Sequence, residues 1–379
     1  TADRGPADVT NSQAIITSYS PYRPFTSIQE SGLYIKELEN SELTYEKKHE
    51  LNIGADMGFL NNRINLAVDW YKRNNYDLIG IVNTQGAGGQ ILKYANIASM
   101  KSHGIEFTLS TKNIKTKDFN WNTDFIFSNA KNEVTDLKQN ANVMELISGN
   151  GFAKQGYPVR GLFSIPFVGL DKDGIPVIIN EKGEATSTDI NFQERQNTGF
   201  LKYEGPTDPT ITGSLGNMFS YKGFRLNLFI TYSFGNVIRL NPVFKAYYSD
   251  LTAMTREFKN RWTLPGDEAK TNVPAILSKR MYDSNEDLKY AYNAYNYSTE
   301  RIAKGDFIRL KEISLAYDFP KAWINPLKLT DLSLKVQATN LFLIYADDKL
   351  NGQDPEFFNA GGVASPVPRQ FTITLRLGL

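Results

Sequence analysis

The fold is decided by a stretch in which apolar and polar side chains alternate strictly: Arg63-Ile64-Asn65-Leu66-Ala67-Val68-Asp69-Trp70-Tyr71. In an extended chain, successive side chains point to opposite faces, so the even-numbered residues share one apolar face and the odd-numbered residues share the other. Alternation with a period of two predicts a β-strand rather than a helix. The strand is expected to have one face in an apolar environment and one face in water.

The same alternation recurs along most of the chain, for example at residues 51–59, 224–232, 332–338 and 371–379. It predicts nine strands, at residues 47–59, 62–77, 99–112, 118–131, 209–221, 224–240, 304–318, 331–345 and 367–379. Within residues 304–318 the apolar positions change from even to odd beside Lys311 and Glu312. A single extra residue at that point would restore the pattern, so a β-bulge is predicted there.

The connections between these strands are alternately short and long. The short ones are residues 60–61, 113–117, 222–223 and the modest 319–330; the long ones are residues 78–98, 132–208, 241–303 and 346–366. Outer-membrane β-barrels have this pattern, with tight turns at one rim and long loops at the other. Soluble sandwiches rarely place loops of more than about 15 residues so regularly on one side.

Composition excludes several classes of function. The 42 Lys and Arg balance 41 Asp and Glu, so the chain lacks the basic field that nucleic-acid binding needs. The absence of cysteine excludes disulfide scaffolds, Cys-ligated zinc, iron–sulfur clusters and thiol catalysis. His49 and His103 are the only imidazoles, which excludes a multi-histidine metal site within the chain.

A membrane location is predicted from the strands. The longest apolar run that we find, at residues 341–346, is far shorter than the roughly 20 residues of a membrane-spanning helix. A barrel needs only about 9–11 residues per strand, and it pairs every backbone group. Aromatic residues lie near the ends of the apolar stretches, as in the girdles of membrane barrels: Trp70, Tyr71, Trp121, Tyr221, Tyr232 and Tyr317. The alternative is that they cap an ordinary sandwich core.

The predicted topology suggests part of a larger barrel. Nine strands cannot close a bacterial single-chain barrel, which has an even number. If residue 379 ends a strand that runs towards the periplasm, the strand from residue 47 runs the same way, and residues 1–46 form an extracellular loop segment. We therefore expect residues 47–379 to hold strands and extracellular loops, and the missing strands to come from another chain or another segment.

Several segments, in the same order along the chain, resemble the SusC/RagA-type TonB-dependent outer-membrane transporters of Bacteroidetes. They are residues 61–71, 96–106 with the core Ser102-His103-Gly104-Ile105-Glu106, 118–122, 221–226, 305–317, 340–342, 354–356 (Asp-Pro-Glu) and 368–371 (Pro-Arg-Gln-Phe). The resemblance extends over nearly the whole chain and covers the C-terminal part of the barrel.

The resemblance implies an all-β, transmembrane antiparallel β-barrel of 22 strands, of which this chain supplies about nine. It also implies an N-terminal plug, which these residues do not contain, and opening by the TonB complex. A SusD-like lipoprotein would cover the outer face and capture substrate. The remaining N-terminal barrel, the plug and outer-membrane lipid are further expected partners, and the location is the outer membrane.

The loop at residues 241–303 is the predicted region of substrate contact, because it is rich in aromatic residues. Aromatic faces stack on sugar rings, and phenol groups form hydrogen bonds with hydroxyl or peptide groups. The candidate substrate-binding residues are Tyr247, Tyr248, Tyr292 and Tyr295. They could equally pack the loop on itself or against the lid protein. Trp262, in the family-like stretch 261–265, is expected to be structural.

No catalytic residue, cofactor or metal ligand is assigned. Asp171-Lys172-Asp173-Gly174 resembles the start of a calcium loop, but it lacks a third oxygen ligand before the glycine, so a turn is expected. Asp69, Glu106 and Asp124 could be imagined as a glycosidase pair, but a water-lined channel needs polar residues on every strand.

The expected function is TonB-dependent import of oligosaccharides or peptides across the outer membrane, without enzymatic activity. The cargo could be a glycan or a peptide, and glycan is favoured because it is the commoner assignment for the resembling family. The alternative is a surface β-rich module that binds glycans without transport.

Overall fold

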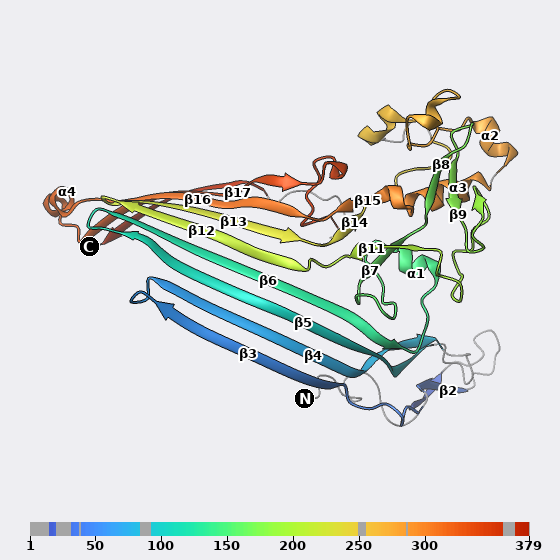
Figure 1. The fold of residues 1–379 in the computed structure, drawn as a ribbon, viewed down its shortest axis with the longest axis horizontal. Helices are drawn as coiled ribbons and strands as arrows, with labels where there is room; N and C mark the ends of the chain where they lie inside the picture. The colour runs from blue at the N-terminus through green and yellow to red at the C-terminus, as the bar shows by residue number, and fades with distance from the viewer. Residues whose placement is uncertain are drawn as a thin grey trace, which may run out of the picture.

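The computed structural model describes residues 15–19, 32–37, 39–83, 92–248, 255–285, 287–358 and 368–378. Its largest element is a nine-stranded sheet in the order β18-β17-β16-β13-β12-β6-β5-β4-β3 (Figure 1). Every neighbouring pair is antiparallel. The strands are β3 (Lys47–Phe59), β4 (Ile64–Asn83), β5 (Leu92–Lys115), β6 (Phe119–Leu137), β12 (Ile211–Tyr221), β13 (Phe224–Phe234), β16 (Phe307–Asp318), β17 (Asp331–Ala346) and β18 (Gln370–Gly378). Among the described residues the sheet is open, with β3 and β18 at its edges.

The register aligns the alternating apolar residues of all nine strands on one face. Leu66 of β4 lies opposite Met57 and Leu109, and Leu109 lies opposite Phe125. In the other half of the sheet, a second row is formed by Leu226, Leu315, Val336 and Ile373. A one-residue slip in any strand would move its apolar set to the other face, so the alternation fixes the pairing.

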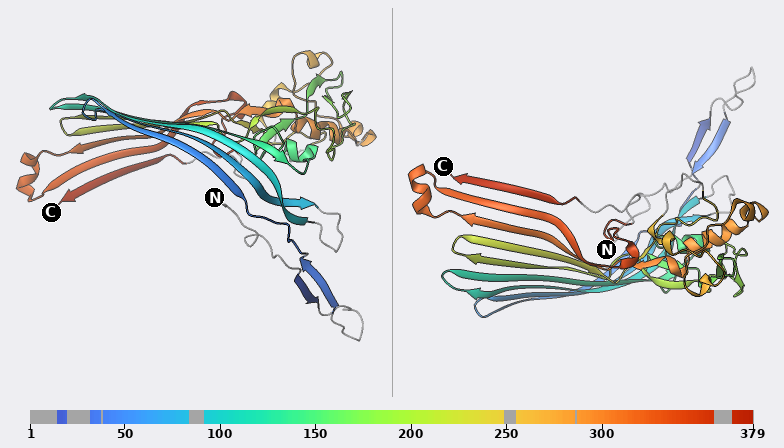
Figure 2. Two further views of the ribbon diagram at one scale, coloured as in Figure 1. Left: turned by 60° about the horizontal axis from the view of Figure 1, so that its bottom comes forward. Right: turned by 90° about the horizontal axis from the view of Figure 1, so that it is seen from above.

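This apolar face is exposed over much of its area. Phe371, Ile373 and Leu375 of β18 are 73%, 74% and 59% exposed. The other sheets in the described part of the chain have only two or three strands, and none covers this face as the second layer of a sandwich would (Figure 2). The sheet therefore shows a large apolar surface of the kind that marks a contact with lipid or protein.

The opposite face is polar. Asp69 lies directly across from Glu106. Ser110 donates a hydrogen bond of 2.6 Å to Asp124, and Lys335 lies 3.9 Å from Glu312. The predicted division into one apolar and one polar face is confirmed.

The predicted bulge is present. Phe229 of β13 pairs with Glu312, and the next residue, Ile230, pairs with Leu310, so Lys311 has no partner on β13. The register with β17 also shifts between Leu310 and Glu312. The extra residue returns the apolar side chains on both sides of it to the same face, as the change in parity required.

The strand connections divide between two rims, as expected. The short-turn rim holds residues 60–63, 116–118 and 222–223, and the connection at residues 319–330 with α4 (Lys321–Ile324) and η6 (Asn325–Leu327) (Figure 1). Lys222 and Gly223 both have positive φ, as two-residue hairpins require. The opposite end, here called the long-loop rim, holds the long connections.

Several strand limits differ from the prediction. β4, β5 and β6 extend beyond residues 77, 99 and 131. Pairing of β4 with β5 continues after a register shift between Asn75 and Leu78, and β5 pairs with β6 as far as Ala98 and Leu137. The predicted strand 224–240 is broken instead. Gly235, with φ of +85°, ends β13, and its N–H donates to Asp306 at 2.7 Å. The remainder forms β14 (Val237–Arg239), which pairs with β15 (Ile302–Lys304).

Aromatic side chains do gather towards the short-turn rim. Trp121 stacks on Phe219 with 5.6 Å between ring centroids, and Phe224 lies 4.4 Å from Tyr317. Tyr71 differs from its neighbour Trp70: it points to the polar face, is only 9% exposed, and lies across from Gly104. Its role is packing within the sheet and not contact at a membrane surface.

Most of the buried apolar core lies beyond the sheet, in a compact assembly at the long-loop rim. We call the described residues among 138–210 and 235–306 the loop layer. Its elements are α1 (Val143–Ile147), β7 (Gly161–Ser164), β8 (Phe167–Leu170), β9 (Pro176–Ile179), β10 (Ala185–Thr186), β11 (Lys202–Pro206), β14, η3 (Arg256–Asn260), η4 (Asp267–Ala269), α2 (Lys279–Ser284), α3 (Leu288–Asn296), η5 (Thr299–Arg301) and β15. A separate hairpin pairs β1 (Ile15–Tyr19) with β2 (Gly32–Glu37). None of the helices in the described ranges is long and apolar enough to span a bilayer.

We expect Gly104→Ala to destabilise the sheet, because Tyr71 occupies the space above this glycine. An added Cβ would lie 2.6 Å from Cζ of Tyr71 and 2.7 Å from the carbonyl oxygen of Asn129. Such overpacking costs about 1–3 kcal/mol. The thermal unfolding midpoint of the full-length protein should fall. Gly216→Ala is the matched control, because its Cβ would meet its nearest atom at 3.7 Å. Equal midpoints for the two variants would contradict the packing argument.

Candidate ligand-binding site

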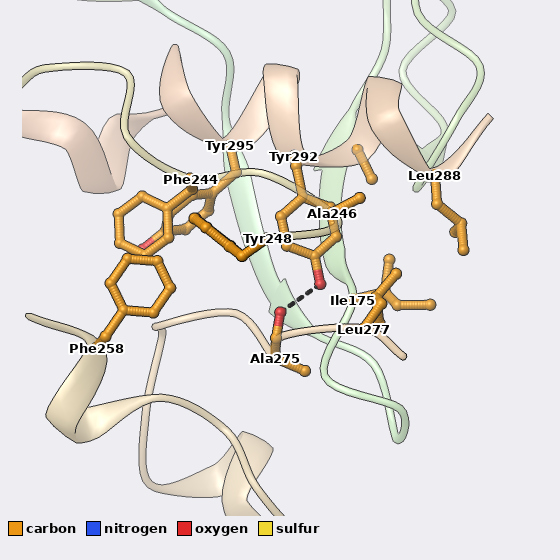
Figure 3. Close-up of a cluster of buried hydrophobic side chains, with 11 residues drawn as sticks. Ile175, Phe244, Ala246, Tyr248, Phe258, Ala275, Leu277, Leu288, Tyr292 and Tyr295 are labelled. Carbon is orange, nitrogen blue, oxygen red and sulfur yellow. Dashed lines mark hydrogen bonds between the residues drawn. The ribbon is translucent and has the colours of Figure 1, made fainter. Parts of the chain in front are cut away.

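The loop layer is held together by an aromatic core to which two long connections contribute, the first between β6 and β12 and the second between β13 and β16 (Figure 3). Ile175 comes from the first connection, between β8 and β9, and the other members come from the second. The buried members are Ile175, Phe244, Ala246, Tyr248, Phe258, Ala275, Leu277, Leu288, Ala291, Tyr292 and Tyr295. Two connections that are far apart in sequence thus form one packed unit.

The rings in this core pack closely. Phe244 stacks on Phe258 with centroids 4.9 Å apart, and Tyr295 meets the edge of Phe244 at 5.0 Å. The Oη of Tyr292 donates a 2.6 Å hydrogen bond to the carbonyl of Ala275 (Figure 3). Burial raises the pKa of Tyr248 to about 12 and raises the pKa values of Tyr292 and Tyr295 as well. All three phenols are therefore neutral near pH 7.

A second cluster joins α1, β7 and β9 to the same helix α3. Its buried members are Ala141, Val143, Leu146, Ile147, Phe163, Ile165, Ile178, Leu201 and Ala294. Asn142 begins α1 with a capping box, because its side chain accepts from the N–H of Glu145 while Glu145 accepts from the N–H of Asn142.

Arg239 links the two connections in the interior. It is only 5% exposed. Its Nη2 donates to the carbonyl oxygen of Phe163 at 2.5 Å and to Oγ of Ser164 at 2.9 Å, and Nη1 donates to the carbonyl oxygen of Ser298 at 3.2 Å. Desolvation lowers the pKa of Arg239 to about 10, so the side chain remains charged at neutral pH. Arg239 joins β14, β7 and the segment that follows α3.

A second buried arginine ties the sheet to the connection after β17. Nη2 of Arg309 lies 2.5 Å from Oδ1 and 2.6 Å from Oδ2 of Asp354, and Nε lies 3.2 Å from Glu356. Arg309 and Asp354 are 3% and 1% exposed. Arg309 belongs to the family-like segment 305–317 and Asp354 to the segment 354–356, and no local sequence pattern predicts that these segments are in contact.

The four candidate tyrosines lie in different environments. Tyr248, Tyr292 and Tyr295 are 8%, 1% and 2% exposed, as members of the aromatic core. Tyr247 is 41% exposed. Trp262 packs against the aromatic core, and its Nε1 donates to Glu268 at 2.9 Å, in agreement with the structural role expected for it. For three of the tyrosines the observed packing corresponds to the alternative of the loop packing on itself.

A cavity of about 480 Å³ opens beside Tyr247. Tyr247 and Tyr282 lie with ring centroids 6.1 Å apart and nearly parallel planes. Lys245, Lys289, Asn293 and Asn296 add ammonium and amide groups to the lining, which also includes one edge of Tyr292. Aromatic faces beside amide and ammonium donors suit a ligand with both flat and hydroxyl or carbonyl groups, such as a sugar or a peptide.

A larger cavity, of about 630 Å³, lies between the end of the sheet and the loop layer. Its charged lining residues are Arg160, Asp208, Lys311 and Glu356. Arg160 and Asp208 form a 2.7 Å ion pair. Sequence reasoning did not identify this cavity as a site. The parity change at Lys311 was the available signal, since bulges often re-aim a side chain beside a functional site.

The motif at residues 171–174 forms a turn. Gly174 has φ of +76°, and Oδ1 of Asp171 accepts from the N–H groups of Asp173 and Ile175 at 2.8 and 2.9 Å. Within the described ranges, no group of three or more His, Asp or Glu side chains is arranged to hold a metal ion. Asp69 and Glu106 face each other across β4 and β5, while Asp124 accepts from Ser110.

Comparison with known proteins gives a consistent result. No family model matches the chain. It is 25% identical over 368 residues to TonB-dependent receptor P3 of Formosa agariphila, covering 90% of this chain and 34% of the relative. It is 26% identical over 364 residues to TonB-dependent receptor SusC of Bacteroides thetaiotaomicron, covering 90% and 32%. The chain is therefore similar to SusC-type TonB-dependent receptors over about 90% of its length.

Solved structures show the same fold for this SusC-like chain. The RagAB peptide transporter superposes with a TM-score of 0.73 at 24% identity, covering 97% of this chain and 38% of that chain. The open-open state of the RagAB peptide importer gives a TM-score of 0.74. The SusC-like chain spans about a third of the length of its curated relatives. The likeness to these receptors supports an outer-membrane location.

We expect Tyr292→Phe to loosen the loop layer, because it leaves the buried carbonyl of Ala275 without a hydrogen-bond donor. An unsatisfied buried group costs about 1–3 kcal/mol. Amide hydrogen exchange in residues 271–278 and 288–296 of the full-length receptor should accelerate about tenfold. Tyr247→Phe serves as the control, since this ring is exposed. Unchanged exchange in the Tyr292 variant would show that this hydrogen bond does not hold the layer.

Proposed function

We propose that the SusC-like chain supplies part of the wall and of the outer vestibule of a TonB-dependent importer of oligosaccharides or peptides. The observation that carries the proposal is the nine-stranded sheet with one exposed apolar face and one polar face. In this proposal the apolar face contacts lipid, and the polar face lines the path of the cargo. A soluble glycan-binding module would have no use for so large an exposed apolar surface.

The proposed barrel has 22 strands. The unpaired edges of β3 and β18 would pair with strands outside these residues, because an open edge in a membrane leaves backbone groups without hydrogen bonds. The plug and the segment that contacts the TonB complex would also lie outside residues 1–379. Residues 1–46 are proposed as an extracellular segment, and residues 47–379 as C-terminal strands and loops.

The loop layer is the proposed vestibule, and a SusD-like lipoprotein is the proposed lid above it. The packed aromatic core gives this layer a fixed shape, which suits a surface that must receive the same partner repeatedly. The likeness to the RagAB peptide transporter supports such an assembly.

The cavity beside Tyr247 is the proposed contact for cargo. Its stacked Tyr247 and Tyr282 rings can hold the flat face of a sugar or a peptide group, and its lysine and asparagine side chains can donate to hydroxyl or carbonyl oxygens. Tyr292 contributes to the floor of this cavity from the aromatic core. Tyr248 and Tyr295 belong to the same aromatic core as Tyr292.

Uptake in cells tests this proposal. A strain that lacks the full receptor gene is complemented with wild-type receptor, Tyr247→Ala or Tyr290→Ala, and is given labelled oligosaccharides and labelled peptides. Tyr290 is the matched control: it is also 41% exposed but does not line the cavity. Truncation of an aromatic anchor weakens binding by about tenfold or more. The concentration for half-maximal uptake should rise by this factor for Tyr247→Ala alone.

Uptake of either cargo class supports import if that uptake requires the wild-type receptor. Equal uptake of both classes with and without the receptor would contradict the function. Identical behaviour of the Tyr247 and Tyr290 variants would contradict the site but leave import intact.

A further inference from the structure

Two lysines and a histidine form a straight row across three strands on the apolar face. Lys72 of β4 lies directly across from His103 of β5, and His103 lies directly across from Lys131 of β6. The register from Ile64 to Asn75 is unbroken, so Lys72 is on the same face as Leu66 and Trp70. All three basic side chains are exposed.

The row borders the apolar band. The preceding row contains Ile53, Trp70 and Ile105, which are 59%, 38% and 40% exposed. Eight residues separate Ile64, near the short-turn rim, from Lys72. At about 3.3 Å per residue and a tilt of about 40°, they cover about 20 Å along the membrane normal. The apolar band of a membrane barrel is about 25 Å tall, which puts Lys72 near its outer edge.

The row has no acidic partner of its own. Among the described residues, Lys72, His103 and Lys131 make no ion pair with a carboxylate, whereas Lys101, one row further out, lies 3.0 Å from Glu133. Lys72 and Lys131 lie on either side of His103, two strand spacings or about 10 Å apart, so two like charges share one exposed row. An arrangement of this kind is stabilised when an anion lies between the basic groups.

Next to Lys131 the surface is hollowed. A cavity of about 260 Å³ is lined by Lys131, Asn132, Arg160, Tyr203, Asp208 and Thr210, among others. Arg160 is already paired with Asp208. Because Ala130 and Asn132 alternate with Lys131, the cavity adjoins one end of the row and reaches both faces of β6.

We propose that Lys72, His103 and Lys131 bind the phosphate of an anionic lipid in the outer leaflet. The proposal rests on the proposed function, because it requires the apolar face to be in the outer membrane. Charge complementarity and the position at the end of the apolar band select this occupant, since a phosphate headgroup is the anionic group found at that depth. Lysines near a membrane surface attract anionic lipids, and their stems lie along the apolar surface.

Lipid retention by the purified full-length receptor tests the proposal. Three proteins are compared: the wild type, the double variant Lys72→Gln with Lys131→Gln, and the same pair changed to Arg. Each is incubated in detergent with diphosphorylated lipid A, and the bound lipid is counted by native mass spectrometry. The charge-matched control is Lys172→Gln with Lys259→Gln, two exposed lysines of the loop layer. Dephosphorylated lipid and inorganic phosphate are the comparison probes.

The glutamine pair should retain about tenfold less phosphorylated lipid than wild type, whereas the arginine pair and the control should match wild type. Dephosphorylated lipid should bind weakly to all variants, and inorganic phosphate at the same concentration should not displace the lipid. Equal retention by wild type and the glutamine pair would overturn the proposal. Equal binding of dephosphorylated lipid, or displacement by inorganic phosphate, would overturn it as well.

Failure of this proposal is distinguishable from failure of import, because lipid retention is measured without cargo. If cargo uptake depends on the receptor but lipid retention is unchanged in the glutamine pair, only the lipid site is wrong. A matching thermal unfolding midpoint for the glutamine and arginine pairs shows that the comparison is made between folded proteins.

Discussion

The whole structure depends on the register that brings the alternating apolar side chains of nine strands onto one face. Cross-strand rows such as Met57, Leu66, Leu109 and Phe125 form only when every strand has its present pairing. Even the bulge at Lys311 serves this arrangement, since it restores the parity of β16. Removing this apolar face from water, into lipid or a protein interior, stabilises the sheet by about 25 cal/mol per Å² of apolar area. The described residues provide no protein layer that does so.

The loop layer is stabilised by different interactions from those of the sheet. Its stability comes from a dry aromatic core and from buried polar links between segments that are distant in sequence. Arg239 bonds to neutral oxygen atoms of β7 and of the segment after α3, and Arg309 is held by Asp354. Removing one partner of a buried ion pair such as Arg309 and Asp354 costs far more free energy than the pair itself contributes. These buried links therefore specify one arrangement of the loops. A rigid layer on a curved sheet can present Tyr247 and its cavity at a fixed position (Figure 2).

Sequence reasoning predicted the sheet well because its signals are local. The alternation from Ile64 to Trp70 needs no knowledge of distant residues, and neither does the two-residue turn at Lys222 and Gly223. It failed at Gly235, where one positive φ ends a strand whose apolar pattern continues. It also failed to separate Tyr247 from Tyr248, which are adjacent and similar but differ in exposure from 41% to 8%. Their environments depend on Phe258 and other residues that fold onto them from elsewhere.

The most direct test of the account is to measure which solvent contacts each face of the sheet. The chain has no cysteine, so nitroxide labels can be attached to cysteines placed at Leu66, Leu228 and Leu375 on one face and at Asn65, Asn227 and Thr374 on the other. In the full-length receptor in lipid bilayers, collisions with oxygen and with a water-soluble nickel chelate are measured by electron paramagnetic resonance. Labels of the first set should collide with oxygen and not with nickel, and labels of the second set should collide with nickel. Labels of the first set that are shielded from both reagents would place this face in a protein interior and contradict the account.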